Sequence, residues 1–133
     1  MDRKKSKVRV GILGCGAIGS RIARSIKREC GDRATVTALF DINPAKSKDL
    51  QKHLPYKNIV KRSYSQLLGS CDLMVEAVNA PDTRTIVRRA LSAKKDVLVM
   101  SVGKFLDGGS IIKMAYKQGA RLLIPSGAVA GID

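Results

Sequence analysis

The chain has 133 residues, enough for one domain, and its 44% hydrophobic and 27% charged residues are typical of a globular protein. No run approaches the roughly 20 consecutive apolar residues of a membrane-spanning helix, and the basic first residues lack the apolar stretch and cleavage site of a secretory signal, so the cytoplasm is the expected compartment. The 25 Lys and Arg residues exceed the 11 Asp and Glu residues and give a net charge of +14, which is typical of proteins that bind nucleic acid. The cations are dispersed along the chain, however, and few aromatic side chains offer a stacking surface, so nucleic acid is not an expected partner.

Short β-branched runs alternate with longer segments of helical period along the first half of the chain. Val8–Leu13 is predicted as a strand and Ala17–Cys30 as a helix, because its apolar residues recur every four positions and Gly31 is placed to end it at C′. Ala34–Phe40 is predicted as a second strand. A helix then begins at Pro44, with Asn43 as its cap.

The same alternation continues in the second half. Strands are predicted at 59–60, 73–78, 96–102 and 122–124, and helices at 65–68, 83–93 and 111–117, the last capped by Asp107 and closed by Gly119. Six strands alternating with helices predict a single α/β domain, with a doubly wound parallel sheet and helices on both faces.

Three glycines, Gly14, Gly16 and Gly19, form a G-x-G-x-x-G motif that follows the first strand and opens the first helix. Asp41 ends the next strand 22 residues later (41 − 19), the spacing of a Rossmann dinucleotide-binding fingerprint. The first glycine permits a tight turn, the second a close approach of the backbone to the pyrophosphate, and the third the packing of helix on strand. Ala17 and Ile18 begin the helix whose free N–H groups would face the phosphates.

Asp41 is expected to accept both adenosine ribose hydroxyls, which favours NAD and repels the 2′-phosphate of NADP. Lys46 and Lys48 are either exposed helix positions or a partial offset to that repulsion, so use of both cofactors is a second hypothesis. Because ligands of open parallel sheets bind at the carboxyl ends of the strands, further cofactor contacts are predicted at Ala77, Val78, Asn79, Met100, Ser101 and Ala128. Glu76, in an apolar strand, is interpreted as a buried structural acid.

Metal binding is not expected, because the three cysteines form no CxxC pair and His53 is the single histidine. The cysteines are interpreted as buried or half-buried thiols.

Segments 10–19, 75–77, 97–103 and 124–133 resemble the L-aspartate dehydrogenase family, and the last two are more specific than the glycine motif. The resemblance implies oxidative deamination of L-aspartate with NAD(P), giving iminoaspartate or oxaloacetate and ammonia, with iminoaspartate supplying NAD biosynthesis. It also implies a homodimer and places Ala128 near the nicotinamide. The turn at Asn79 departs from the serine-containing turn that the resemblance implies.

The resemblance further implies a substrate domain with a catalytic histidine, which residues 1–133 do not contain, and His53 lies too far upstream to replace it. We therefore expect a cofactor-binding portion, with 126–133 as the start of the substrate and dimerisation domain and little turnover by this chain alone. Two alternatives stay open: the cofactor domain of a homoserine-type or other amino-acid dehydrogenase, and a nucleotide-sensing or nucleic-acid-associated regulator that only the net charge supports.

Overall fold

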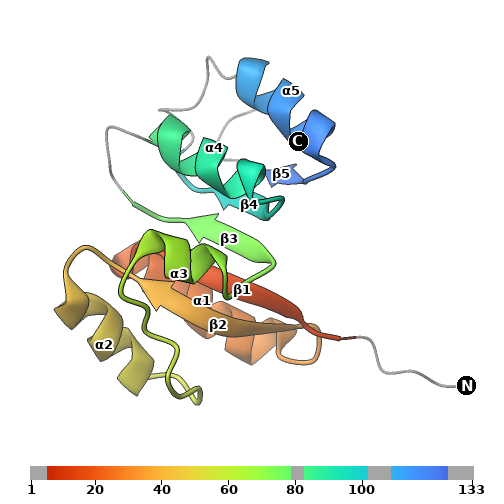
Figure 1. Ribbon diagram of the computed structural model, residues 1–133. Helices are drawn as coiled ribbons and strands as arrows, with labels where there is room; N and C mark the ends of the chain where they lie inside the picture. The colour runs from red at the N-terminus through yellow and green to blue at the C-terminus, as the bar shows by residue number, and fades with distance from the viewer. Residues whose placement is uncertain (1–5, 79–82, 102–108, 126–133) are drawn as a thin grey trace, which may run out of the picture.

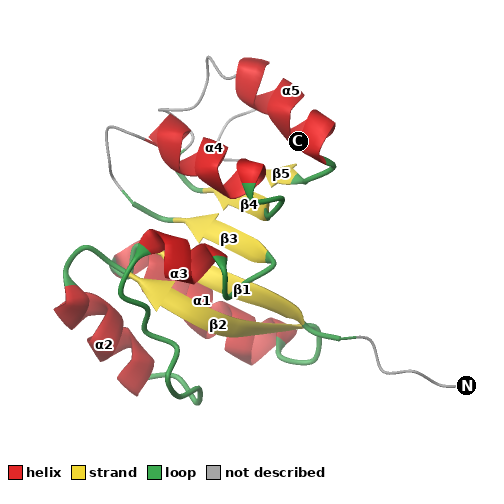
Figure 2. Cartoon of the chain, in the orientation of Figure 1, coloured by secondary structure: helices red, strands yellow, loops and turns green. Residues whose placement is uncertain are grey.

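The computed structural model describes residues 6–78, 83–101 and 109–125 of the chain (Figure 1). Strands and helices alternate along them (Figure 2). In chain order the elements are β1 (Val8–Leu13), α1 (Ala17–Cys30), β2 (Ala34–Phe40), α2 (Pro44–Lys52), α3 (Tyr64–Leu68), β3 (Leu73–Glu76), α4 (Thr83–Ser92), β4 (Asp96–Val99), α5 (Gly109–Gln118) and β5 (Leu122–Leu123).

The strands form one parallel sheet in the order β2-β1-β3-β4-β5. β1 is therefore flanked by β2 on one side and by β3 on the other, and the chain reverses its direction of winding at this point. In open parallel sheets, ligands bind in the crevice outside the carboxyl ends of the strands at such a switch point. The topology thus directs attention to the ends of β1, β2 and β3.

Helices cover both faces of the sheet, as a doubly wound fold requires. Side chains of α3, α4 and α5 form one apolar cluster with one face, including the fully buried Leu67, Leu91 and Ile111. Side chains of α1 and α2 form a second cluster with the other face, where Ala23 and Leu50 are buried. Figure 1 shows α3 in front of the sheet and α1 behind it. The predicted fold class is confirmed.

The described residues contain five sheet strands instead of the six predicted. The segment at 59–60 makes only one parallel bridge, from Val60 to Leu39. The side-chain oxygen of Gln51 accepts the N–H groups of Ile59 at 2.8 Å and of Val60 at 3.3 Å, so these donors are not available to a further strand pairing. A local side-chain acceptor has replaced the predicted third strand.

β5 ends at Leu123, one residue earlier than predicted. β3 and β4 are also shorter than predicted and end at Glu76 and Val99. The Glu76 carboxylate accepts the N–H groups of Val78, Met100 and Ser101, which turns both segments out of the ladder.

The helix ends agree with the sequence in part. Asn43 caps α2 by accepting the Ala45 N–H at 3.1 Å, and Gly119 follows α5 with a φ of +70°. Gly31 directly follows the last residue of α1, as predicted, and has a right-handed φ of −61°. Asp107 lies outside the described residues.

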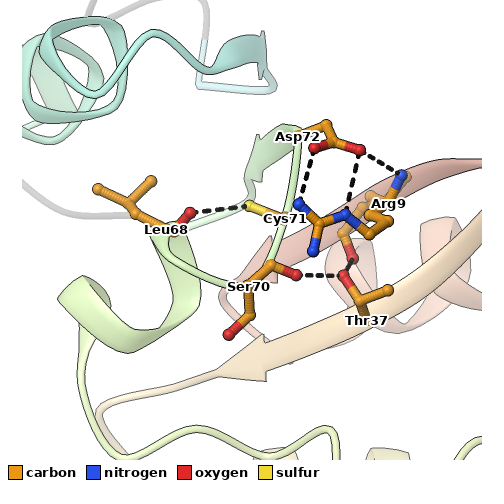
Figure 3. A network of polar contacts seen from close by, with 7 residues as sticks. Arg9, Thr37, Leu68, Ser70, Cys71 and Asp72 are labelled. Carbon is orange, nitrogen blue, oxygen red and sulfur yellow. Dashed lines mark hydrogen bonds and ion pairs between the residues drawn. The ribbon is translucent and has the colours of Figure 1, made fainter.

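A polar network fixes the amino ends of β1 and β3 (Figure 3). The Arg9 guanidinium bonds both oxygens of Asp72, at 2.9 and 3.3 Å, and the Thr37 hydroxyl donates to the Ser70 carbonyl at 2.6 Å. Thr37 lies where the β1–β2 register shifts, between the pairs that involve Val10 and Gly11. The network therefore connects β2, β1 and the segment that enters β3, on the side away from the carboxyl ends of the strands. None of the described helices is long and apolar enough to cross a membrane.

Candidate functional site

The turn after β1 requires glycine at its first position. Gly14 has a φ of +98°, a region that residues with a side chain rarely adopt. A Cβ atom there would lie 2.5 Å from the Ala77 carbonyl oxygen. The Gly14 N–H donates to the Phe40 carbonyl at 2.8 Å. The turn is thus held between the ends of β2 and β3.

The other two glycines of the motif differ from each other in their surroundings. A Cβ atom on Gly19 would overlap the Gly14 carbonyl oxygen, so α1 packs directly on the turn. A Cβ atom on Gly16 would meet nothing within 4 Å, and open space lies over this position. Gly16 is the N-cap of α1, with no side-chain cap and no acidic residue in the first turn. The free N–H groups and the positive end of the helix dipole therefore suit an anionic group placed over Gly16.

Asp41 lies at the same turn, as the spacing predicts. One carboxylate oxygen accepts the Cys15 N–H at 2.8 Å, and the other accepts the Asn43 N–H at 2.8 Å. These bonds orient the carboxylate between the glycine turn and the start of α2. Each carboxylate oxygen retains further acceptor capacity, so the group can still receive a pair of ligand hydroxyls.

A cavity of about 470 Å³ opens between the glycine turn and the ends of β2 and β3. Five of the predicted cofactor residues line it together: Gly14, Gly16, Asp41, Ala77 and Val78. Ala17, Ile18 and Gly19 belong to the adjoining first turn of α1 and do not line this cavity. Asn79 and Ala128 lie outside the described residues.

Apolar walls of this cavity come from residues that sequence reasoning missed. Ile42 is 92% exposed, and Tyr64 and Ile86 contribute from α3 and α4. The Tyr64 hydroxyl donates to the Ile86 carbonyl at 2.7 Å, and burial raises the pKa of Tyr64 far above its usual range. The position of Ile42, an apolar residue directly after Asp41, could have indicated from the sequence that it contributes to the cofactor site. Nothing in the sequence indicates that α3 and α4 converge here.

Met100 and Ser101 lie at the end of β4 and do not line this cavity. The Ser101 hydroxyl donates to Glu76 at 2.7 Å, and the N–H groups of Met100 and Ser101 donate to the same carboxylate at 3.1 and 3.0 Å. Glu76 is fully buried. Its interpretation as a structural acid is confirmed, because it ties the end of β3 to the segment after β4.

A second hollow of about 840 Å³ adjoins the first and shares Phe40, Asp41 and Ile42 with it. Lys46 lines the first cavity, whereas Lys48 lines the second. Three further cations also line the second hollow, namely Lys52, Lys61 and Arg62. The surroundings of Asp41 are therefore more basic than Lys46 and Lys48 alone indicate.

The thiols are placed for packing. Cys15 and Cys71 are buried, and Cys30 is half-buried. Burial, together with the nearby Asp41 carboxylate, raises the pKa of Cys15 to about 12. Among the described residues, no group of three or more His, Cys, Asp or Glu side chains could hold a metal ion.

Comparisons with known proteins agree with this geometry. Residues 14–125 match the family model described as homoserine dehydrogenase, NAD binding domain. An L-aspartate dehydrogenase of Methanococcus maripaludis is 36% identical over 130 residues, covering 95% of this chain and 48% of the relative. One of Methanosarcina mazei is 39% identical over 132 residues, covering 95% and 47%. The chain thus spans about half the length of these curated relatives.

Solved structures agree on the fold. The WlbA dehydrogenase of Bordetella pertussis, in complex with NADH and UDP-GlcNAcA, superimposes with a TM-score of 0.78 at 23% identity, covering 90% of this chain and 37% of that one.

Proposed function

The chain belongs to the family of homoserine dehydrogenase NAD-binding domains, and from this premise we propose that it is the cofactor-binding part of an NAD-dependent L-aspartate dehydrogenase. The single observation that carries the cofactor half of the proposal is the open space over Gly16 at an uncapped helix N-terminus, beside an oriented Asp41 carboxylate. A dinucleotide needs both features, one for its pyrophosphate and one for its ribose.

Residues of the 470 Å³ cavity and of the adjoining first turn of α1 would hold different parts of NAD. The backbone from Gly16 to Ile18 would hold the pyrophosphate, and Asp41 would accept the two adenosine ribose hydroxyls. Ile42, Tyr64 and Ile86 would enclose the adenine ring by apolar contact. When bound, NAD supplies a hydride acceptor. The predicted contacts of Asn79, Met100, Ser101 and Ala128 on the nicotinamide side remain part of this proposal.

L-aspartate is proposed as the substrate because the curated relatives carry that name at 36% and 39% identity. The reaction would be oxidative deamination, giving iminoaspartate or oxaloacetate and ammonia, with iminoaspartate entering NAD biosynthesis. Homoserine is the alternative that the family description favours. Formation of NADH by the enzyme that contains this chain should require L-aspartate and not homoserine; the opposite preference would favour the alternative.

The cofactor proposal is tested by fluorescence titration of the chain with NADH and NADPH. Asp41→Ala should weaken NADH binding and raise the affinity for NADPH relative to NADH, because the carboxylate that repels a 2′-phosphate is lost. Asp49→Ala removes an exposed carboxylate from α2 and is the matched control. Equal effects of the two variants would remove Asp41 from this role.

Binding of NADP as well as NAD is part of the proposal, because Lys46 and the basic hollow beside Asp41 can offset its repulsion of a 2′-phosphate. For the assembled enzyme we propose a cytoplasmic homodimer, which light scattering on the full-length protein would test.

A further inference from the structure

Two neighbouring hollows lie beside α3, one toward α4 and the other toward residues 60–62, and neither shares a lining residue with the cofactor cavity. One, of about 750 Å³, is lined by Ser65, Leu68, Gly69, Thr85, Arg88, Arg89, Ser92, Ala93 and Lys95. The other, of about 470 Å³, is lined by Val60, Lys61, Arg62, Gln66, Gly69 and Ser70. They meet at Gly69. We call their combined surface the α3–α4 groove; it contains five cations and no carboxylate.

The cations of the groove are not neutralised within the described part of the chain. None of the five lies within 4.0 Å of a carboxylate there, whereas Arg9, Arg28, Arg33 and Arg121 each have an acidic partner. Arg88 donates one bond to the Ser110 hydroxyl at 3.3 Å, and Arg89 one to the Ser65 hydroxyl at 2.8 Å. Each guanidinium keeps several free N–H groups. A hollow lined by one sign of charge concentrates the field and attracts counter-ions of opposite charge.

The packing of α3 and α4 explains why the sequence did not indicate this groove. Its cations come from positions 61–62, 88–89 and 95, which are dispersed in the chain. α3 and α4 cover the same face of the sheet (Figure 1), and Tyr64 joins them by donating to the Ile86 carbonyl. Arg89 lies 4.8 Å from the centre of the Tyr64 ring. Folding therefore gathers charges that look evenly spread in sequence.

We propose that the α3–α4 groove binds the phosphate backbone of duplex nucleic acid. Its polar lining consists of Lys, Arg, Ser, Thr and Gln side chains, which are among the groups that contact phosphate oxygens. Of the described residues, none of the large apolar side chains that are strongly exposed lies in the groove, so it lacks the apolar centre of a protein interface. Single strands are disfavoured, because neither hollow is lined by an aromatic side chain on which bases could stack.

The test compares two double variants that remove the same charges from opposite faces of the sheet. Arg88→Gln with Lys95→Gln changes the groove, and Arg24→Gln with Lys27→Gln changes exposed positions on α1. Each lowers the net charge from +14 to +12 (14 − 2). None of the four residues lines the cofactor cavity, so NADH binding serves as the folding control for both. Fluorescence anisotropy with a labelled DNA duplex of about 20 base pairs is measured between roughly 50 and 200 mM salt. Each neutralised phosphate contributes about −0.9 to the slope of log K against log salt.

The groove variant should bind the duplex roughly 60-fold more weakly at about 0.1 M salt and lose about 1.8 from the slope, as expected for two lost phosphate contacts. The α1 variant should stay close to the parent in both quantities. Equal weakening by the two variants would contradict the proposal, because net charge alone would then explain binding. Tighter binding of polyglutamate than of the duplex would overturn the proposal in favour of an acidic protein partner. Absence of duplex binding at about 50 mM salt, where charges are weakly screened, would also overturn it.

Discussion

Gly16 and Gly19 are only three residues apart, yet enlarging them should change opposite properties of the protein. Gly16→Ser adds a side chain in open space at the N-cap of α1. Serine is a better N-cap than glycine by a few tenths of a kcal/mol, and loss of glycine also reduces the entropy of the unfolded chain, so the gain is about 0.5–1 kcal/mol. The same side chain occupies the space proposed for the pyrophosphate. Cofactor affinity should therefore fall at least about tenfold, or about 1.4 kcal/mol.

Gly19→Ala should destabilise the fold, because the added methyl group overlaps the Gly14 carbonyl oxygen. Overpacking costs about 1–3 kcal/mol, and the upper value applies here because the neighbour is backbone. Alanine recovers about 1 kcal/mol of helix propensity. The net loss is then about 2 kcal/mol. An unfolding entropy of about 2.1 cal/mol/K per residue gives roughly 0.28 kcal/mol/K for the 133 residues. Dividing the net loss of about 2 kcal/mol by this entropy gives a fall in Tm of about 7 °C.

Thermal unfolding without ligand and NADH fluorescence titration measure the two effects separately. Gly16→Ser should raise Tm by about 2–4 °C and lose NADH binding. NADH binding by Gly16→Ser within twofold of the parent would refute the placement of the pyrophosphate. An unchanged Tm for Gly19→Ala would refute the close packing of α1 on the turn.

Three further predictions concern stability, pH and thiol chemistry. Glu76→Ala leaves the backbone N–H groups of Val78 and Ser101 without their acceptor, whereas the Met100 N–H keeps the backbone carbonyl of residue 76. The free energy of unfolding in urea should therefore fall by about 2 kcal/mol or more, and a loss below about 1 kcal/mol would contradict this role. The Arg9 guanidinium lowers the pKa of Asp72 below its usual value. The pair therefore stabilises the fold above the unfolded pKa of about 3.9, and this stability is lost as pH falls through the lower folded pKa. Asp72→Asn should show a smaller drop in Tm than the parent between about pH 7 and pH 3, and an equal drop would refute the linkage. Cys15 is buried, and burial raises its pKa to about 12. A thiol reagent at about pH 8 should therefore modify Cys30 first and Cys15 only on unfolding. Rapid modification of Cys15, detected by mass spectrometry, would contradict its burial.

Local sequence determines the elements that were predicted correctly. The bounds of β1, α1 and β2 agree with the sequence because periodicity, Gly14 and the residues at the helix start all act within a few positions. The spacing to Asp41 also places it at the turn, where it accepts the Cys15 N–H.

Contacts between distant side chains determine the parts that the sequence could not predict. The side-chain oxygen of Gln51 accepts the N–H groups of the expected third strand. The Glu76 carboxylate accepts N–H groups just beyond β3 and β4. Tyr64 and Ile86 reach the cavity only after α3 and α4 pack on one face. The α3–α4 groove has the same origin, since its cations are separated in sequence.

The most direct test of the central claim is a titration of the ¹⁵N-labelled chain with NADH, followed by amide chemical shifts. The account requires saturable shifts that are largest in the glycine turn from Gly14 to Gly19, at Asp41 and Ile42, and at Ala77 and Val78. The amide of Lys95, which lines neither the cofactor cavity nor the hollow beside Asp41, should stay unchanged. Absence of saturable shifts, or shifts confined to residues outside the cofactor cavity beside Gly16 and Asp41 and the adjoining turn, would contradict the assignment of this site to NAD.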